Sequence, residues 1–141
     1  MATRLNPYLV LDGNAREAVA FYQKALEAQL IGIQAFGDMP PNPDQPLPPG
    51  VSDRVMHAQL KVGDTDLMFS DTFPGMPYQV GSNVTIAIIT DDAATARRYF
   101  EALADGGRVD MPIQETHWSP AYGQLVDRYG VVWQISTEKK A

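Results

Sequence analysis

The sequence predicts an α+β fold of two βαβββ modules, which form a curled mixed sheet around a cleft with the helices on the outer face. Two amphipathic helical segments lie about half the chain apart and share letters, since "YQKAL" at 22–26 resembles "YFEAL" at 99–103. One apolar strand-like segment precedes each helix and three follow it, so the pattern repeats within the chain. We therefore expect a single domain over 1–141, with module one at about 1–75 and module two at about 80–141.

The first module follows from hydrophobic periodicity. A strand at 7–11 precedes a helix that Asn14 can cap, and Glu17 stands three residues later, as in a capping box. The apolar residues of this helix recur with helical spacing and are Ala18, Phe21, Tyr22, Ala25 and Leu26. Three further strands are expected at 28–36, 54–62 and 65–70.

The second module repeats this order. A strand at 84–89 leads to a helix that begins after Asp91-Asp92 and ends before Gly106-Gly107, a natural C-terminal stop. Its apolar stripe is Ala96, Tyr99, Phe100, Leu103 and Ala104. Strands at 108–114, 122–127 and 131–136 complete the module.

The segment at 37–53 separates the second and third strands of the first module. It holds six of the chain's eleven prolines, which prevents both a helix and a central strand. We expect a long surface loop. It is either a lid over a pocket or an insertion without a function of its own.

The strands after this loop can be oriented by counting. "KVGDTD" indicates a hairpin with a two-residue turn at Gly63-Asp64. The predicted pairs are Val62–Thr65, Lys61–Asp66, Leu60–Leu67, Gln59–Met68, Ala58–Phe69 and His57–Ser70. Because paired residues share a face, one face is wholly apolar and can lie under the helix. The other face carries His57, Gln59, Met68 and Ser70, with an ion pair expected between Lys61 and Asp66.

The second face of that hairpin is mixed, with an apolar lining and a few polar groups, as ligand cavities commonly are. Alternation elsewhere gives similar polar sets, which include Tyr8, Thr85 and Gln134. If the sheets of both modules curl together, these residues line one cleft. Trp118 and Tyr122 are expected at its rim, where an aromatic plane can stack on a bound molecule.

Composition excludes several classes of function. The chain is 45% hydrophobic and 20% charged, and no apolar run approaches the ~18 residues of a membrane span. A formal net charge of −6 argues against nucleic acid as a partner, because phosphate binding requires clustered Lys and Arg. The absence of cysteine excludes thiolate catalysis, disulfides and Cys-based zinc sites. The N-terminal residues show no secretion signal, so we expect a cytoplasmic protein.

Several phrases of the chain resemble one known superfamily. They are "FY" in the first helix, "MHA" at 56–58, "MFSD" at 68–71, "MP" followed by "HW" at 117–118, and the pattern D-x-x-G-x-x-W at 127–133. Together with the layout, they are similar to the vicinal oxygen chelate (glyoxalase, bleomycin-resistance and dioxygenase) superfamily. The most similar subfamily is the PhnB-like one, often labelled a 3-demethylubiquinone methyltransferase. The resemblance covers almost the whole chain.

This resemblance implies where a divalent metal would be held. The superfamily's metalloenzymes take one ligand from the first and one from the last strand of each module. Those positions fall here near Pro7 (Asn6 or Tyr8 with a shift of one residue), and at Met68, Thr85 and Gln134. Divalent cations prefer several hard donors, usually with charge, so we expect no metal and no other cofactor. No Gly-rich adenosyl-binding loop is present either, which argues against methyl transfer.

Individual residues keep alternative interpretations. His57 is a candidate catalytic base, a polar wall of the pocket, or a buried histidine with a structural hydrogen bond. His117 is expected in a surface turn or at the mouth of the cleft. Trp133 is assigned to the core, and "DRYG" at 127–130 to a turn with glycine in its special backbone position.

Three hypotheses for function remain, and in one of them side chains fill the cleft and the domain only mediates association. The first is a metal-free protein that binds a small molecule through Tyr8, His57, Gln59, Met68, Ser70, Thr85, Trp118, Tyr122 and Gln134. The alternative is a glyoxalase- or dioxygenase-type enzyme that acts on a small oxygenated substrate, with non-standard metal ligands or with His57 as base. The sequence leaves open whether the protein is an enzyme. The resemblance also implies a homodimer, in which modules of two chains can pair.

Overall fold

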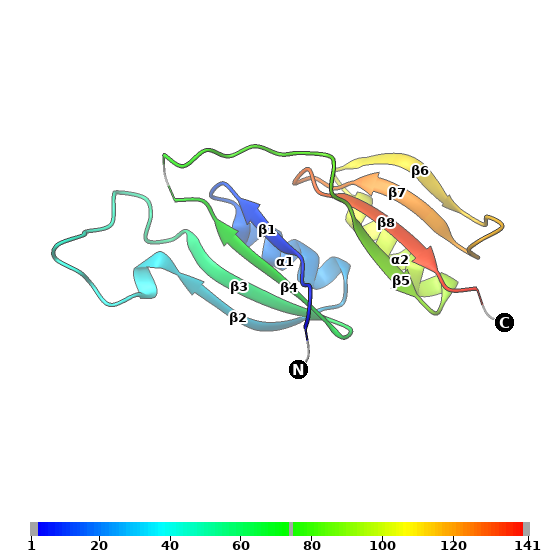
Figure 1. Ribbon diagram of the computed structural model, residues 1–141, viewed down its shortest axis with the longest axis horizontal. Helices are drawn as coiled ribbons and strands as arrows, with labels where there is room; N and C mark the ends of the chain where they lie inside the picture. The colour runs from blue at the N-terminus through cyan, green and yellow to red at the C-terminus, as the bar shows by residue number, and fades with distance from the viewer. Residues whose placement is uncertain (1–2, 74, 140–141) are drawn as a thin grey trace. The chain divides into compact units, whose positions relative to one another are not determined.

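The computed structural model describes residues 3–73 and 75–139, and the chain divides into two compact units, Met1–Tyr78 and Gln79–Ala141. Each unit holds one βαβββ module, which confirms the predicted α+β class and the internal repeat. The strands form two separate four-stranded mixed sheets, one in each unit (Figure 1). Neither helix of the described part of the chain is long and apolar enough to cross a membrane.

The first unit contains the elements β1 (Tyr8–Leu11), α1 (Ala15–Ala25), β2 (Gln29–Ala35), a 3-10 turn η1 (Phe36–Asp38), β3 (Val55–Val62) and β4 (Thr65–Asp71). The strand order across its sheet is β1-β4-β3-β2. β1 runs parallel to β4, whereas β4 with β3 and β3 with β2 are antiparallel.

The second unit repeats this topology with β5 (Ile86–Thr90), α2 (Ala93–Ala104), β6 (Arg108–Gln114), β7 (Tyr122–Val126) and β8 (Val132–Thr137). Its strand order is β5-β8-β7-β6, and β5 is parallel to β8. All eight predicted strands and both predicted helices are therefore confirmed, with differences of at most two residues at their ends.

The register of the β3–β4 hairpin follows the prediction from its turn. Five of the six predicted pairs form the ladder, from Val62 with Thr65 to Ala58 with Phe69, and the predicted pair His57–Ser70 lies beyond its end. Gly63 has the positive φ of 56° that such a turn requires. A two-residue turn fixes the register of the two strands that it joins, so counting outward from the turn was sufficient to assign each side chain to a face.

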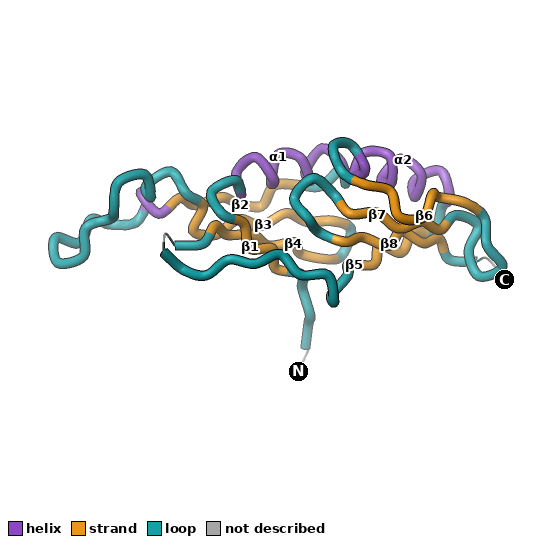
Figure 2. The backbone as a smooth tube through the Cα atoms, turned by 90° about the horizontal axis from the view of Figure 1, so that it is seen from above, coloured by secondary structure: helices purple, strands orange, loops and turns teal. Residues whose placement is uncertain are grey.

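Each helix covers one face of its own sheet (Figure 2). In the first unit, α1 buries Ala18 and Tyr22 against β3 and β4, where the Tyr22 and Phe69 rings stack at 5.7 Å. In the second unit, Phe100 of α2 packs on Gly123 of β7. A Cβ at Gly123 would lie 2.6 Å from the Phe100 ring, so only glycine permits this approach. The core of each unit lies between its helix and one face of its sheet.

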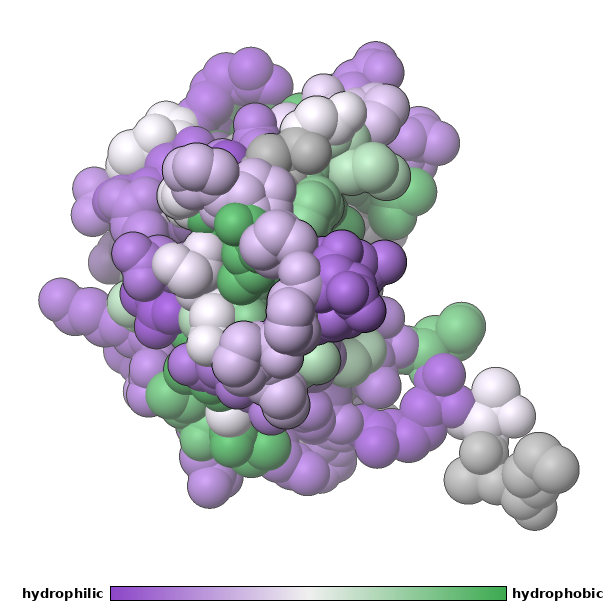
Figure 3. All heavy atoms as spheres, turned by 90° about the vertical axis from the view of Figure 1, so that its left-hand side faces the viewer, coloured by the Kyte–Doolittle hydropathy of each residue, from purple (hydrophilic) through white to green (hydrophobic). Residues whose placement is uncertain are grey.

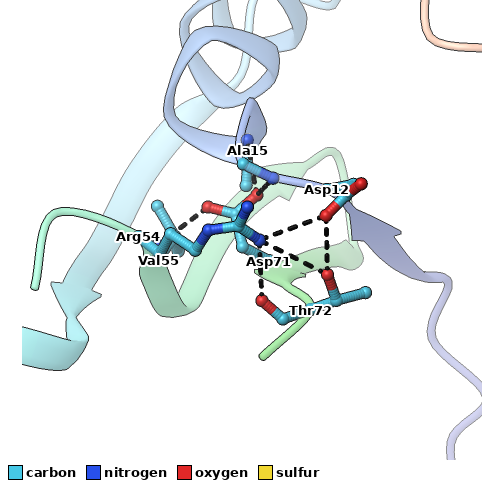
Figure 4. A network of polar contacts seen from close by, with 7 residues as sticks. Asp12, Ala15, Arg54, Val55, Asp71 and Thr72 are labelled. Atoms are coloured by element: carbon cyan, nitrogen blue, oxygen red, sulfur yellow. Dashed lines mark hydrogen bonds and ion pairs between the residues drawn. The ribbon is translucent and has the colours of Figure 1, made fainter. Parts of the chain in front are cut away.

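The N-terminus of α1 is capped differently from the prediction. Asn14 occupies the N-cap position, but its side chain makes no capping hydrogen bond. Asp71, at the end of β4, supplies the acceptor instead: its Oδ1 accepts the backbone N–H of Gly13 at 2.7 Å and of Ala15 at 3.0 Å (Figure 4). Its Oδ2 accepts the N–H of Val55 at 2.9 Å. One buried carboxylate therefore joins the start of α1, the start of β3 and the end of β4.

A second, more exposed network lies beside Asp71. Arg54 donates from Nη1 to the Thr72 carbonyl at 2.9 Å and to Asp12 Oδ1 at 3.2 Å, and the Thr72 hydroxyl donates to Asp12 at 2.9 Å (Figure 4). The Thr72 hydroxyl, and after it Arg54, lowers the pKa of the Asp12 carboxyl below its ordinary value. The network holds the β1–α1 turn against the segment that follows β4.

The second helix does use its own cap. The Asp92 carboxylate accepts the backbone N–H of Thr95 at 3.0 Å, and the hydroxyl of Thr95 donates to it as well. These hydrogen bonds lower the pKa of Asp92. The predicted start of this helix after Asp91-Asp92 is confirmed, and so is its end before Gly106, which has a φ of 80°.

The proline-rich segment forms the expected surface loop. Residues 37–50 are exposed, and the loop extends beyond the end of the first sheet between η1 and β3 (Figure 1). Its base is closed by Gly37 N–H to the Ser52 carbonyl and Phe36 N–H to the Arg54 carbonyl, both at 2.9 Å, while Val51 is fully buried. The side of the molecule from which the loop projects is mostly hydrophilic or intermediate in hydropathy, with scattered apolar residues (Figure 3).

The cap assignment gives a direct test. We expect Asp71→Asn to lower the free energy of unfolding by about 2–3 kcal/mol, because an amide in this place turns a donor toward backbone N–H groups that need an acceptor. Asn14→Ala is the matched control and should change stability by no more than about 0.5 kcal/mol. Urea unfolding of both variants measures this difference. An equal loss in the two variants would contradict the assignment of the cap to Asp71.

Candidate functional site

Each sheet has a face that the helix of its own unit leaves uncovered. In the first unit, alternation along the strands buries Leu60, Leu67 and Phe69 toward α1 and turns their neighbours the other way. We call the resulting surface the first open face. It carries Tyr8, Val10, His57, Gln59, Met68 and Ser70. In the second unit, the second open face carries Thr85, Ala87, Tyr122, Gln124, Gln134 and Ser136.

On the first open face, the register places Met68 at the centre. Its neighbour on β1 is Tyr8, and its neighbour on β3 is Gln59. The Tyr8 hydroxyl lies 3.4 Å from His57 Nδ1, and the two rings are tilted with centroids 5.9 Å apart. The centre of this face is therefore an apolar thioether, flanked by a hydroxyl–imidazole pair and an amide.

The arrangement around His57 is not that of a charge-relay base. Its ring contacts Tyr8, which lies beside Met68 and not beside Ser70. Asp71, the carboxylate next in the chain, points to the opposite face, as predicted, and binds backbone N–H groups there. What the geometry offers at this position is an exposed pair that can pass a proton between an imidazole and a phenol.

The second open face has a hydrogen-bonded line of side chains across three strands. The Tyr122 hydroxyl of β7 donates to Gln134 Oε1 of β8 at 2.8 Å. The Gln134 Nε2 donates in turn to the hydroxyl of Thr85, just before β5, at 3.0 Å. All three side chains are partly exposed. Gln134 is thus held by both ends of its amide, and its neighbours on either side are fixed with it.

An aromatic cluster adjoins this line. The Trp118 ring meets the Tyr122 ring edge-on at 5.4 Å, and His117 meets Trp118 in the same way at 4.7 Å. Trp118 is 50% exposed. The predicted turn is confirmed here, since the Thr116 N–H bonds to the Ser119 carbonyl at 2.8 Å and His117 is exposed. Trp118 therefore borders the second open face beside Tyr122.

The other tryptophan belongs to the core, as predicted. Trp133 is 1% exposed, and its Nε1 donates to Asp127 Oδ2 at 2.7 Å. Asp127 Oδ1 accepts the N–H groups of Tyr129 and Val131, which closes the predicted turn, and Gly130 has a φ of 87°. The strand that carries Gln134 on its open side is thereby anchored by the residue next to it on its buried side.

The donor chemistry at the superfamily's metal positions does not fit a divalent cation. Met68 offers a thioether, Thr85 a hydroxyl and Gln134 a neutral amide whose oxygen already accepts from Tyr122. Pro7 offers no donor side chain, and the next residue, Tyr8, is directed to His57. Within the described residues, no three His, Asp or Glu side chains gather closely enough to hold a metal ion.

Sequence reasoning missed one contact at the end of the first open face. The register does place Lys61 opposite Asp66, but Arg4 donates to the Asp66 carboxylate. The hydrogen bond from Arg4 is the largest cause of a lowered pKa at Asp66, and Gln59 contributes the next. No sequence signal located Arg4, because it precedes the first strand and reaches a residue 62 positions away.

The structure brings the nine predicted ligand-binding residues together in two groups. Tyr8, His57, Gln59, Met68 and Ser70 share the first open face, and Thr85, Tyr122 and Gln134 share the second, with Trp118 at its border. Their union in one cleft stays a prediction. Gln124, which pairs with Gln134, is a polar residue of the second open face that sequence reasoning did not select.

Comparison with known proteins identifies similar chains. Residues 3–136 match the family described as 3-demethylubiquinone-9 3-methyltransferase. The chain is 32% identical over 142 residues to protein YjdN of Escherichia coli (strain K12), and the match covers 96% of each chain. The crystal structure of protein PA1353 from Pseudomonas aeruginosa matches with a TM-score of 0.85 at 38% identity, over 99% of this chain and 100% of that one.

A more distant structure shows the fold class. The glyoxylase/bleomycin resistance protein/dioxygenase domain from Frankia sp. EAN1pec matches with a TM-score of 0.63 at 12% identity, over 99% of each chain. An identity this low establishes a shared fold and nothing about activity. The resemblance found in the sequence is confirmed by both comparisons, at the level of the family and of the fold.

The contrast between the two tryptophans can be tested in solution. We expect Trp118→Phe to remove the solvent-exposed part of the tryptophan emission, so that the remaining Trp133 emission is shifted to the blue and resists quenching by acrylamide. The reason is the half-exposed position of Trp118 against the buried position of Trp133. Steady-state fluorescence with acrylamide titration measures both the emission maximum and the quenching, and the unchanged protein is the reference. If acrylamide quenches the Trp118→Phe variant as strongly as the unchanged protein, the exposed position of Trp118 at the border of the second open face is refuted.

Proposed function

The chain belongs to the 3-demethylubiquinone-9 3-methyltransferase family, and from this premise we propose that it is a metal-free protein that binds a small molecule. The observation that carries the proposal is the second open face. There, the connected hydroxyl and amide groups of Tyr122, Gln134 and Thr85 lie beside the half-exposed ring of Trp118.

This combination of groups is typical of a binding surface. Small-molecule sites combine an apolar or aromatic surface with a few fixed polar groups, which set the orientation of the ligand. Here the aromatic surface is Trp118 with Tyr122, and the fixed polar groups are Gln134 and Thr85. The exposed aromatic ring offers a flat apolar surface on which a planar molecule can pack. A planar, oxygenated organic molecule satisfies both parts of this surface.

Methyl transfer, which the family description names, has little support in this chain. Adenosyl cofactors carry a carboxylate, and helix N-termini often hold such anions. The N-terminus of α1 is already occupied by Asp71 and that of α2 by Asp92. The connection before α1 adds Asp12, and the one before α2 adds Asp91, so that negative charge faces any anion at either position.

The metal-free part of the proposal rests on the donors. A divalent cation at Gln134 would have to share the neutral amide oxygen with the Tyr122 hydroxyl, and it would gain no charged ligand there. The thioether of Met68 is a soft donor, suited to other metals than those that take hydroxyl and amide oxygens. We therefore propose that the ligand binds without a metal bridge.

One observation favours an enzyme as the second candidate. The exposed Tyr8–His57 pair on the first open face can exchange a proton, which is what removal of a proton next to a carbonyl requires. In this alternative, His57 acts as the base on a small hydroxy-carbonyl compound. Loss of turnover in His57→Gln with unchanged binding would support this candidate over simple binding.

We also propose a homodimer in the cytoplasm. The edge strand β2 carries no charged residue, and it exposes the apolar side chains of Leu30 (40% exposed) and Ile31 (50% exposed). Such an edge is compatible with association between copies of the chain. The absence of cysteine is compatible with a reducing compartment.

The metal-free proposal has a direct measurement. Protein purified without chelator or affinity nickel should contain no stoichiometric metal by elemental mass spectrometry. Calorimetric titration with Ni, Zn and Mn should then give no binding heat beyond dilution, because the donor set is neutral. Stoichiometric, tightly bound metal would reject this part of the proposal and favour the enzyme candidate with unconventional ligands.

Binding itself can be tested with 4-methoxyacetophenone, a planar neutral molecule with oxygen acceptors. We expect it to shift the Trp118 indole signal in a 15N correlation spectrum and to leave the buried Trp133 signal in place. Trp118→Ala should weaken binding by roughly 2- to 10-fold, the range for loss of one aromatic contact. Phe73→Ala is the control, because Phe73 is 41% exposed but follows β4 and contacts Phe36. Equal weakening in both variants, or no shift at Trp118, would argue against a ligand on this face.

A further inference from the structure

The hydrogen bonds on the second open face have a direction. Tyr122 is the donor in the first, because Gln134 Oε1 can only accept. Gln134 Nε2 is the donor in the second, because an amide nitrogen cannot accept. The proton order along Tyr122, Gln134 and Thr85 is therefore fixed by the amide at its centre.

This direction determines what remains available at the Thr85 end. The oxygen of Thr85 accepts from Gln134, so its own hydroxyl hydrogen is left to donate elsewhere. Gln134 Nε2 carries a second hydrogen that its bond to Thr85 does not use. Two donors, the Thr85 hydroxyl and the second N–H of Gln134, thus lie side by side at this end. The Tyr122 hydroxyl already donates its only hydrogen to Gln134 Oε1.

The line is short enough for a ring with one substituent. The hydroxyl groups of Tyr122 and Thr85 are joined through the single side-chain amide of Gln134, by hydrogen bonds of 2.8 and 3.0 Å. A ligand that lies along this amide therefore reaches from the Tyr122 ring to the Thr85 hydroxyl. Trp118 and Tyr122 provide the aromatic surface at one end, and the two donors lie at the other.

The first open face has no equivalent of this line. The registers place Met68 on β4 where Gln134 lies on β8, since Met68 pairs with Gln59 and Gln134 with Gln124. A thioether cannot donate a hydrogen bond. The position on the first open face that corresponds to Gln134 therefore cannot join its neighbours in such a line.

We infer that the Tyr122–Gln134–Thr85 line selects ligands in which a planar ring carries an acceptor oxygen, of the carbonyl type. The ring packs against Trp118 and Tyr122, and its oxygen accepts from Thr85 and Gln134. Tyr122 is a positioning residue, because its hydroxyl holds the amide of Gln134 in the orientation that leaves the donors free. This inference rests on the proposed small-molecule function and adds the chemical class of the ligand.

Two probes that differ in a single oxygen test the inference. 4-Methoxyacetophenone and 4-ethylanisole share the ring and the methoxy group, but only the former has a carbonyl. Their dissociation constants are measured from the Trp118 indole and Gln134 side-chain amide signals in 15N correlation spectra. We expect the ketone to bind about five-fold more tightly, the effect of one or two net hydrogen bonds.

Variants then locate the donors. Thr85→Val keeps the shape of the side chain and removes the hydroxyl. The ratio of the two dissociation constants, 4-ethylanisole over 4-methoxyacetophenone, should therefore fall toward one. Tyr122→Phe keeps the ring and frees the Gln134 amide to turn its oxygen toward Thr85, which then loses its free hydrogen. The preference should therefore also fall, although the Tyr122 hydroxyl does not touch the probe. Ser136→Ala, which removes a hydroxyl from the same face outside the line, should leave the preference unchanged.

The outcomes separate this inference from the proposed function. If both probes bind equally, or if either Thr85→Val or Tyr122→Phe keeps the full preference, the directional line is refuted while small-molecule binding stands. If neither probe moves the Trp118 signal, binding on this face is refuted, and the selection falls with it.

Discussion

A single helix can bury only one face of a four-stranded sheet, and the rest of this structure depends on that constraint. α1 and α2 each cover one face of their sheet, and the strands bury large apolar side chains such as Phe69 and Trp133 on that face. Alternation then turns every second side chain to the uncovered side. The open faces are thus a geometric consequence of a βαβββ module, and their chemistry is the part of the sequence that packing leaves free to vary.

The two modules use this freedom differently. At matching places in the strand ladders, the first has Met68 and His57 where the second has Gln134 and Tyr122. The first open face is therefore apolar at its centre, and the second is polar and internally hydrogen-bonded. The polar arrangement is stable because each atom of the Gln134 amide has a partner, which avoids the penalty for an unsatisfied polar group. Duplication has preserved the backbone while the two faces have diverged.

Sequence reasoning succeeded where local rules dominate. The β3–β4 register followed from the two-residue turn at Gly63, and the core position of Trp133 followed from alternation along one strand. It failed at the cap of α1, where the local rule favoured Asn14. Asp71, 56 residues from Ala15, takes that role because its carboxylate also serves the start of β3. Gln134 was placed on the correct face, but its bond to Thr85 depends on a parallel β5–β8 pairing that no turn specifies.

The closed base of the proline-rich loop has an evolutionary consequence. Hydrogen bonds from Gly37 to Ser52 and from Phe36 to Arg54 clamp the two ends of the loop, and the buried Val51 anchors it just inside the clamp. The exposed residues between these two ends take no part in the pairing of the strands. The entropy cost of closing a loop also rises only slowly with its length. This segment can therefore gain or lose residues, or accept a whole inserted domain, while β2 and β3 keep their pairing. Among related chains, it is the place where length should drift most freely.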